Sequence, residues 1–173
     1  MKKEINWIYK VFLLSFIFSV IFSGASTALV EVLNPIALAI ILVIVIAIGI
    51  LFDMIGVAVL TCKESNLHAK ASKKMKGAKQ AIALIKNSTK VSSVCNDVIG
   101  DICGIVSGSL GAALTLELIG VINVSSVMIT AIVTAIISSL TVVFKAIFKD
   151  VAEKNSDAIV YTAGKIISVF KKQ

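Results

Sequence analysis

The sequence predicts an all-α integral membrane protein, with four transmembrane helices and a basic amphipathic juxtamembrane helical belt. The first observation is composition: apolar residues make up 58% of the 173 residues and charged residues 16%, and the mean hydropathy is +1.01. Soluble domains contain about 45–50% apolar and about 25% charged residues. A small domain cannot bury so much apolar surface, so the composition excludes a soluble enzyme, a disordered tail and a secreted disulfide scaffold.

The second observation is length, because four apolar stretches reach the roughly 20 residues that a helix needs to cross a bilayer. The first stretch runs from about Val11 to Val30 and defines an N-terminal segment, residues 1–34. Its flanking lysines and the small residues Ser23–Ala28 also fit a cleaved signal peptide, which would leave three spans. The apolar character continues through Val30, which favours a spanning helix or signal anchor.

The other three stretches form a predicted core, residues 35–150, with spans at about 35–61, 91–118 and 121–144. Pro35 stands where a helix tolerates proline, in the first turn. The connection 64–90 places apolar residues on one helical face and lysines on the other, and Gly77 bends or splits this helix. A second amphipathic helix is expected in the tail, residues 151–173. The apolar residues of these two faces are Leu67, Ala71, Met75, Ala78, Ile82, Ile85, Ile159, Ala163, Ile166, Ile167 and Phe170.

The third observation is the placement of charge. All 17 basic residues are lysines, and they lie before the first span, between the second and third, and after the fourth. The remaining turns, residues 31–34 and 119–123, have none. Because lysine collects on the cytoplasmic side, we expect a multi-pass inner (plasma) membrane protein with both termini cytoplasmic. Its lysines would face the anionic inner leaflet, and no nucleic acid partner is expected.

Polar residues inside the spans are the best indication of function. Asp53 lies about 12 Å from the end of the second span, and Asp97 and Asp101 lie about 9 and 15 Å into the third, beside Asn96. Each central carboxylate costs about 2.5–3.5 kcal/mol in a bilayer. Three interpretations remain open: an oxygen-only cation site suited to Mg²⁺, Na⁺ or Ca²⁺, an ion pair of Lys145 with Asp97 or Asp101, and a proton relay.

The third span also carries small residues at four-residue spacing, Gly100, Gly104 and Gly108. Such a face permits close helix approach. Hydroxyls follow a helical spacing in the fourth span, including Thr134 and Thr141, so we expect these two spans to pack closely there.

The remaining reactive residues do not indicate an enzyme. Cys62, Cys95 and Cys103 form no CxxC pair, and His68 is the single histidine. We interpret the cysteines as buried apolar residues. No nucleophile–base arrangement, HExxH or phosphate loop occurs, so neither catalytic residues nor an organic cofactor are predicted.

The order of these elements resembles the DUF21 transmembrane domain of the CorB/CorC/cyclin-M magnesium transporter family, over roughly residues 49–157. The matching residues are Gly77-Ala78-Lys79-Gln80-Ala81, Asn96 at a Gly-Asn position, Phe52 and Ala58, and Lys149, Ala152 and Asn155. The resemblance implies a homodimer with a Mg²⁺ site between core helices and exchange against Na⁺. The chain would be a short member without the cytosolic CBS pair, and the first span an addition to a three-helix core.

The departures from the family pattern fall at its ion-binding positions. Lys145 replaces a glutamate, Gly56 replaces another, Asp53 stands at a serine, and Gly100 replaces an asparagine. Two functions therefore remain open. The first is a protein that binds or exports a divalent cation through Asp53, Asn96, Asp97 and Asp101. The second is a non-transporting membrane scaffold or partner subunit, in which Lys145 neutralises buried aspartates.

Overall fold

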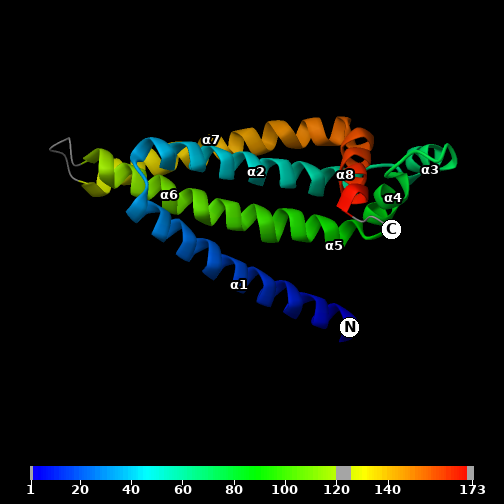
Figure 1. The fold of residues 1–173 in the computed structure, drawn as a ribbon, viewed down its shortest axis with the longest axis horizontal. Helices are drawn as coiled ribbons and strands as arrows, with labels where there is room; N and C mark the ends of the chain where they lie inside the picture. The colour runs from blue at the N-terminus through cyan, green and yellow to red at the C-terminus, as the bar shows by residue number, and fades with distance from the viewer. Residues whose placement is uncertain (1, 120–125, 171–173) are drawn as a thin grey trace. The chain divides into compact units, whose positions relative to one another are not determined.

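The computed structural model describes residues 2–119 and 126–170, and within these ranges it contains helices and no strand (Figure 1). Four helical segments are long and apolar enough to cross a membrane, as predicted. They are α1 (Lys2–Val32), α2 (Pro35–Thr61), the consecutive α5 (Ser88–Ser93), η1 (Val94–Gly100) and α6 (Asp101–Ile119), and α7 (Ser126–Lys154). The shorter helices are α3 (Glu64–Ser72), α4 (Ala78–Lys86) and α8 (Ser156–Phe170).

The helix boundaries follow local chemistry. The side chain of Asn34 accepts a hydrogen bond from the Ala37 N–H at 2.9 Å and so caps α2, with Pro35 in its first turn. The amphipathic connection is divided at Gly77, as predicted, and the expected tail helix is α8. The fourth span is longer than predicted, because α7 continues past Phe144 to Lys154. The predicted turn at residues 119–123 falls almost wholly outside the described residues.

The chain divides into two compact units. We call Met1–Gly49 with Val98–Phe144 the apolar unit, and Ile50–Asp97 with Lys145–Gln173 the lysine-rich unit. Helices α2 and α7 contribute a part to each.

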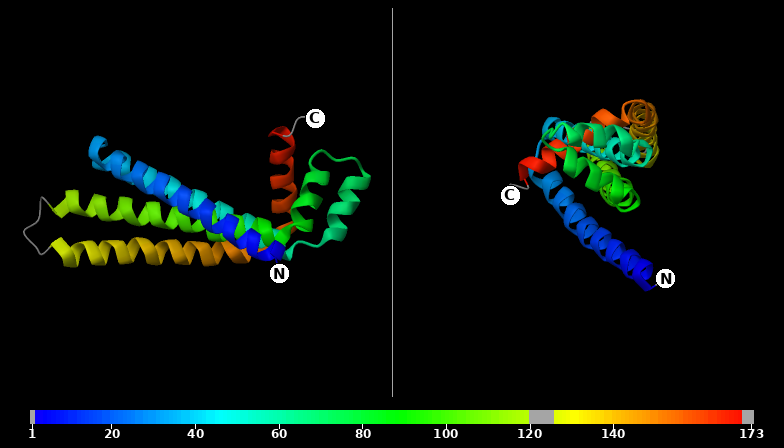
Figure 2. Two further views of the ribbon diagram at one scale, coloured as in Figure 1. Left: turned by 90° about the horizontal axis from the view of Figure 1, so that it is seen from below. Right: turned by 90° about the vertical axis from the view of Figure 1, so that its right-hand side faces the viewer.

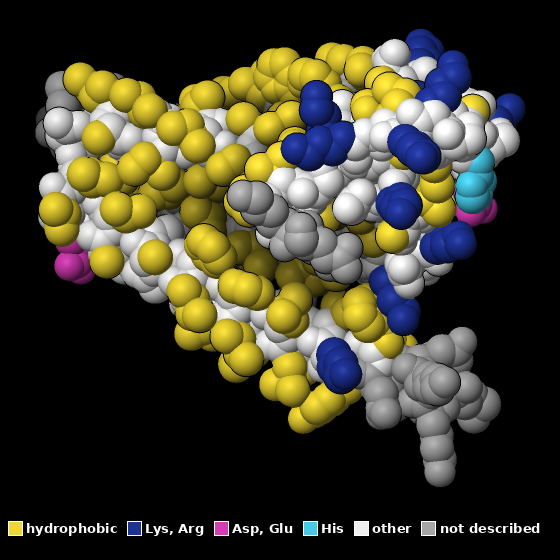
Figure 3. All heavy atoms as spheres, turned by 45° about the vertical axis from the view of Figure 1, so that its right-hand side comes forward, with side chains coloured by type: hydrophobic (Ala, Val, Ile, Leu, Met, Phe, Trp, Pro, Cys, Tyr) yellow, Lys and Arg dark blue, Asp and Glu magenta, His cyan; other side chains and the backbone are white. Residues whose placement is uncertain are grey.

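In the apolar unit α1 packs along α6, and the hydroxyls of Ser26 and Ser109 are 3.0 Å apart across this contact. Outward-facing side chains of α1 and α7 are largely apolar and exposed, which suits lipid (Figure 3). The buried core is formed by α2, α6 and the end of η1, through Leu38, Leu42, Val98, Ile102, Val106 and Leu110.

The predicted packing on the glycine face is wrong. A Cβ added at Gly104 or Gly108 would meet nothing within 4 Å. Helices α6 and α7 meet instead at Gly111, where an added Cβ would lie 3.0 Å from Ile137 Cδ1. The hydroxyls of Thr134 and Thr141 donate to carbonyls of their own helix, Thr130 O and Ile137 O, because a threonine within a helix reaches the preceding turn easily.

In the lysine-rich unit α3 and α4 form a hairpin that packs on α8 (Figure 2). Two glycines allow α4 and α8 to approach closely. A Cβ added at Gly77 would lie 2.6 Å from Lys165 Cα, and a Cβ added at Gly164 would lie 2.6 Å from Ala81 N. Gly77 also has a φ of +91°, which favours glycine. The core comprises Ala58, Val59, Cys62, Leu67, Ala81, Ala152 and Val160.

Candidate functional site

The candidate site is a buried ion pair in the lysine-rich unit. Lys145 Nζ on α7 lies 3.0 Å from Asp53 Oδ2 on α2, and the Asp53 side chain is 9% exposed. Lys145 is 27% exposed, which is typical of a long side chain whose stem is covered. The pair places an ammonium directly against a carboxylate of an apolar helix, so Asp53 is neutralised by the chain itself.

Asn96, on η1, lies opposite Gly56, which follows Asp53 by three residues on α2. A Cβ at Gly56 would come within 2.0 Å of Asn96 Oδ1, so glycine provides the space that this side chain occupies. Asn96 Nδ2 donates to Ser92 Oγ at 3.3 Å, whereas Asn96 Oδ1 is buried with no hydrogen-bond partner in the described part of the chain. A buried carbonyl oxygen without a partner is costly, and it can accept a hydrogen bond or a cation.

The segment that carries Asn96 is a π-helix, η1. This wider coil is rare, and it is found frequently at functional sites. Its larger number of residues per turn also changes which side chains share a face.

The other two predicted acids are not buried. Asp97 is exposed and accepts a 2.6 Å hydrogen bond from Ser93 Oγ. Asp101 is exposed as well and belongs to the apolar unit. Among the described residues no group of three or more His, Cys, Asp or Glu is placed to hold a metal ion. The structure therefore brings Asp53 to Lys145, in place of the expected Asp97 or Asp101, and assembles no three-carboxylate site.

A second polar network, which sequence reasoning missed, joins the residue after α2 and a residue of α3 to α8. Cys62 Sγ donates to Asp157 Oδ1 at 3.1 Å, and Asn66 donates to the other carboxylate oxygen. Burial, followed by the hydrogen bond to Asp157, raises the pKa of Cys62 to about 12. The same hydrogen bond from Cys62 lowers the pKa of Asp157. A protonated, buried thiol is a poor nucleophile, so this network serves the fold.

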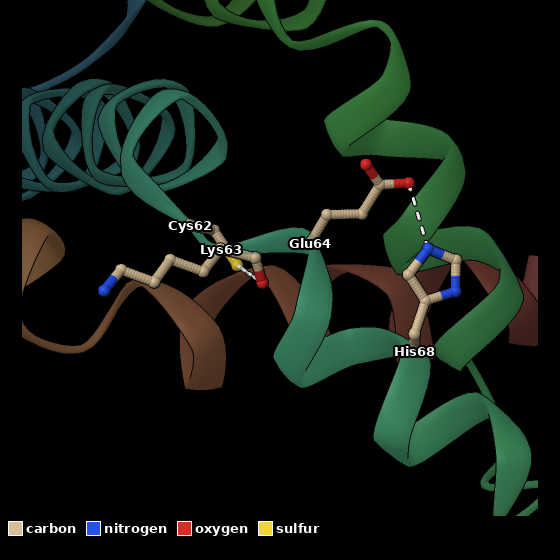
Figure 4. A network of polar contacts seen from close by, with 4 residues as sticks. All are labelled: Cys62, Lys63, Glu64 and His68. Carbon is tan, nitrogen blue, oxygen red and sulfur yellow. Dashed lines mark hydrogen bonds and ion pairs between the residues drawn. The ribbon is translucent and has the colours of Figure 1, made fainter.

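Nearby on α3, His68 Nε2 lies 3.1 Å from Glu64 Oε1, an exposed pair within one helix (Figure 4). The single histidine is thereby engaged in a local contact four residues apart. A surface pair of this kind contributes little to stability.

Comparison with protein-family models, curated proteins and solved structures finds no match to this chain. The family resemblance therefore depends on its short motifs. One of these, Gly77-Ala78-Lys79-Gln80-Ala81, has a packing explanation, because Gly77, Ala78 and Ala81 are buried in the unit where α4 meets α8. A pattern required for helix packing is weak evidence for ion chemistry.

Proposed function

We propose that this chain is a four-pass inner-membrane protein that serves as a non-transporting subunit of a membrane assembly. The observation that carries the proposal is the 3.0 Å pair between Lys145 and Asp53. Among the residues whose burial is described, Asp53 has the one buried carboxylate, and a tethered ammonium occupies the position at which a transported cation would have to bind it.

The topology in this proposal has both termini in the cytoplasm. It is supported by the four apolar helices and by lysines on α3, α4 and α8, which belong to the lysine-rich unit. Helices of this composition would lie at the headgroup level of the anionic inner leaflet.

A partner chain accounts for the two remaining acids. Asp97 and Asp101 are exposed within a helical segment that is apolar enough to cross a membrane, Ser88–Leu116. Charged groups in lipid are nearly always paired or directed away from the hydrocarbon. A second copy of this chain would bring a Lys145 that is already engaged with Asp53, so the observations favour a different membrane protein with its own intramembrane basic residue over the expected homodimer.

The magnesium site implied by the family resemblance fits these residues poorly. Mg²⁺ prefers about six oxygen ligands in near-octahedral geometry. Here the candidate ligands are one carboxylate on α2 and one amide oxygen on η1, and an ammonium is 3.0 Å from the carboxylate. A resident Mg²⁺ would be repelled by Lys145 unless that side chain moved away.

A second candidate function is cation binding as cargo, favoured by the unpartnered Asn96 Oδ1, which lies against Gly56, three residues after Asp53. In this version Lys145 leaves and a Mg²⁺ or Na⁺ ion takes its place between the two oxygens. Lys145 keeps its charge and moves away, and the bound cation replaces it as the counter-charge of Asp53. Na⁺ leaves the site neutral, whereas Mg²⁺ leaves one excess positive charge.

One set of experiments separates the candidates. The purified protein is melted in neutral detergent with Mg²⁺, Mn²⁺, Ca²⁺ or Na⁺ at constant ionic strength, and reconstituted vesicles are assayed for Mg²⁺ uptake. The subunit proposal predicts no cation-specific stabilisation and no uptake. Stabilisation or uptake that is lost in Asp53→Asn and Asn96→Leu, but kept in Asp150→Asn as an exposed acidic control, would establish the cargo function instead.

A further inference from the structure

The turn between α3 and α4 carries a basic hollow that the function above does not use. Residues 71–72 and 74–80 line a hollow of about 540 Å³, and they include three exposed lysines, Lys74, Lys76 and Lys79. The sequence contains no acidic residue from Ser65 to Asn96, so these lysines have no carboxylate neighbour in their own segment. Such a concentration of ammonium groups attracts a polyvalent anion.

The turn is held in one shape by α8. Tyr161 Oη donates to the carbonyl of Lys76 at 3.2 Å, and Lys70 Nζ stands 4.6 Å from the centroid of the Tyr161 ring. Gly77 lies against the backbone of Lys165. Lys74 has a φ of +53°, a conformation that L residues seldom adopt and that persists when the surroundings impose it. A turn that is already ordered loses little conformational entropy when it binds a ligand, which strengthens binding.

The start of α4 adds to the positive potential of the hollow. Its N-cap is Gly77, which provides no side-chain hydrogen bond, and its first turn contains no acid. The N-terminal end of a helix carries a partial positive charge and exposes backbone N–H groups to an anion. Lysines and helix terminus thus point to the same class of ligand, a phosphate.

Apolar side chains around the turn indicate which phosphate. Met75, between Lys74 and Lys76, is 42% exposed, and α8 exposes Ile166 and Ile167. The same unit has an apolar groove of about 370 Å³ between α2 and α8. A soluble phosphate has no apolar group to contact these surfaces, whereas a phospholipid carries a phosphate and acyl chains in one molecule.

We infer that the α3–α4 turn binds the phosphate of an anionic phospholipid headgroup. Lys74, Lys76 and Lys79 supply the charge, and the exposed apolar residues beside them contact the acyl region. The inference depends on the membrane insertion proposed above, but not on the role of the ion pair. Retention of the chain in membranes after an alkaline carbonate wash tests insertion separately.

The test compares two triple variants with the same change in net charge. Lys74→Gln, Lys76→Gln and Lys79→Gln alter the hollow, and Lys86→Gln, Lys149→Gln and Lys154→Gln alter exposed lysines elsewhere in the lysine-rich unit. Each protein is titrated in neutral detergent with phosphatidylglycerol, phosphatidylcholine or inorganic phosphate. Melting temperature and native mass spectrometry report binding, and melting without lipid reports folding.

A lysine near an anionic surface contributes about fivefold to affinity, so losing all three from the hollow should weaken phosphatidylglycerol binding about a hundredfold. The control variant should remain within about threefold of the unmodified chain. Equal losses in both variants would overturn the inference in favour of diffuse attraction. Binding of phosphatidylcholine or of inorganic phosphate alone with the same stabilisation would also overturn it, because the anionic lipid would then not be the ligand.

Discussion

Replacing Lys145 by methionine tests the ion pair most directly. Methionine retains much of the volume of the lysine stem but removes the ammonium, so Asp53 stays buried without a counter-charge. At the observed 3.0 Å, and with an effective dielectric constant of about 20, the attraction that is lost is about 5.5 kcal/mol. Removing one partner of a buried pair costs about 3–5 kcal/mol in measured cases, and we expect a loss of that size in the free energy of unfolding.

The assay is reversible unfolding in mixed micelles, followed by helical circular dichroism. Lys149→Met is the matched control, because Lys149 lies one turn further along α7 and is exposed. It should change the free energy of unfolding by less than about 1 kcal/mol. Adding Asp53→Asn to Lys145→Met should recover most of the loss, since a neutral amide needs no counter-charge.

Two outcomes would refute this reasoning. If Lys145→Met costs no more than Lys149→Met, the pair does not neutralise a buried carboxylate. If the double variant is as unstable as Lys145→Met, the loss comes from altered packing around α7. A recovery of Lys145→Met by Mg²⁺ or Na⁺, absent with choline, would show that a cation replaces the ammonium, and would favour the cargo function.

Three further predictions concern the lysine-rich unit. Gly77→Ala should lower the free energy of unfolding by about 2–4 kcal/mol, because the φ of Gly77 is +91° and an added Cβ would lie 2.6 Å from Lys165 Cα. The control is Gly24→Ala in the apolar unit, which has open space around it and should be neutral or slightly stabilising in the same unfolding assay. Cys62, with a pKa of about 12, should resist alkylation by iodoacetamide at pH 8, and Asp157→Asn should speed the reaction by removing a hydrogen bond and a negative charge that raise this pKa. Because folding lowers the pKa of Asp157, this residue should stabilise the fold at pH values above its ordinary pKa of 3.8, and the stabilisation should disappear as the pH falls through the folded-state pKa. In a plot of unfolding free energy against pH, Asp157→Asn should therefore reduce the slope on the acid side. An unchanged slope would contradict the assignment.

The partner of Lys145 could have been found from the sequence if the fourth span had been placed correctly. Ending that span near Phe144 put Lys145 at its cytoplasmic edge. With α7 continuing to Lys154, Lys145 lies nine residues from the helix end, or about 13 Å. Asp53 lies about 12 Å from the end of α2, so the two residues match in depth. A run of apolar residues does not show how far a helix extends beyond it, since polar residues also continue helices.

Other features depend on tertiary contacts that no local pattern specifies. The four long helices, the split at Gly77 and the helix α8 follow from apolar periodicity and chain length, and these were predictable. The contact between Ser26 and Ser109 joins two residues that are typical of any helix surface. The network of Cys62, Asn66 and Asp157 likewise forms because α8 returns to the end of α2, which the sequence pattern does not encode.

If the chain is inserted as proposed, its three aspartates in apolar helices meet the same energetic cost in two different ways. Asp53 is paired within the chain with Lys145, whose ammonium is itself partly desolvated. A cation from solution can bind Asp53 only after it displaces that ammonium. Asp97 and Asp101 are exposed, and in the proposed assembly a partner chain provides their counter-charge. A carrier needs the reverse arrangement, with an exchangeable ion at the buried site and no unmatched charge facing lipid. An internally paired buried acid and two exposed acids therefore favour our proposal of a subunit that holds another membrane protein over an ion carrier.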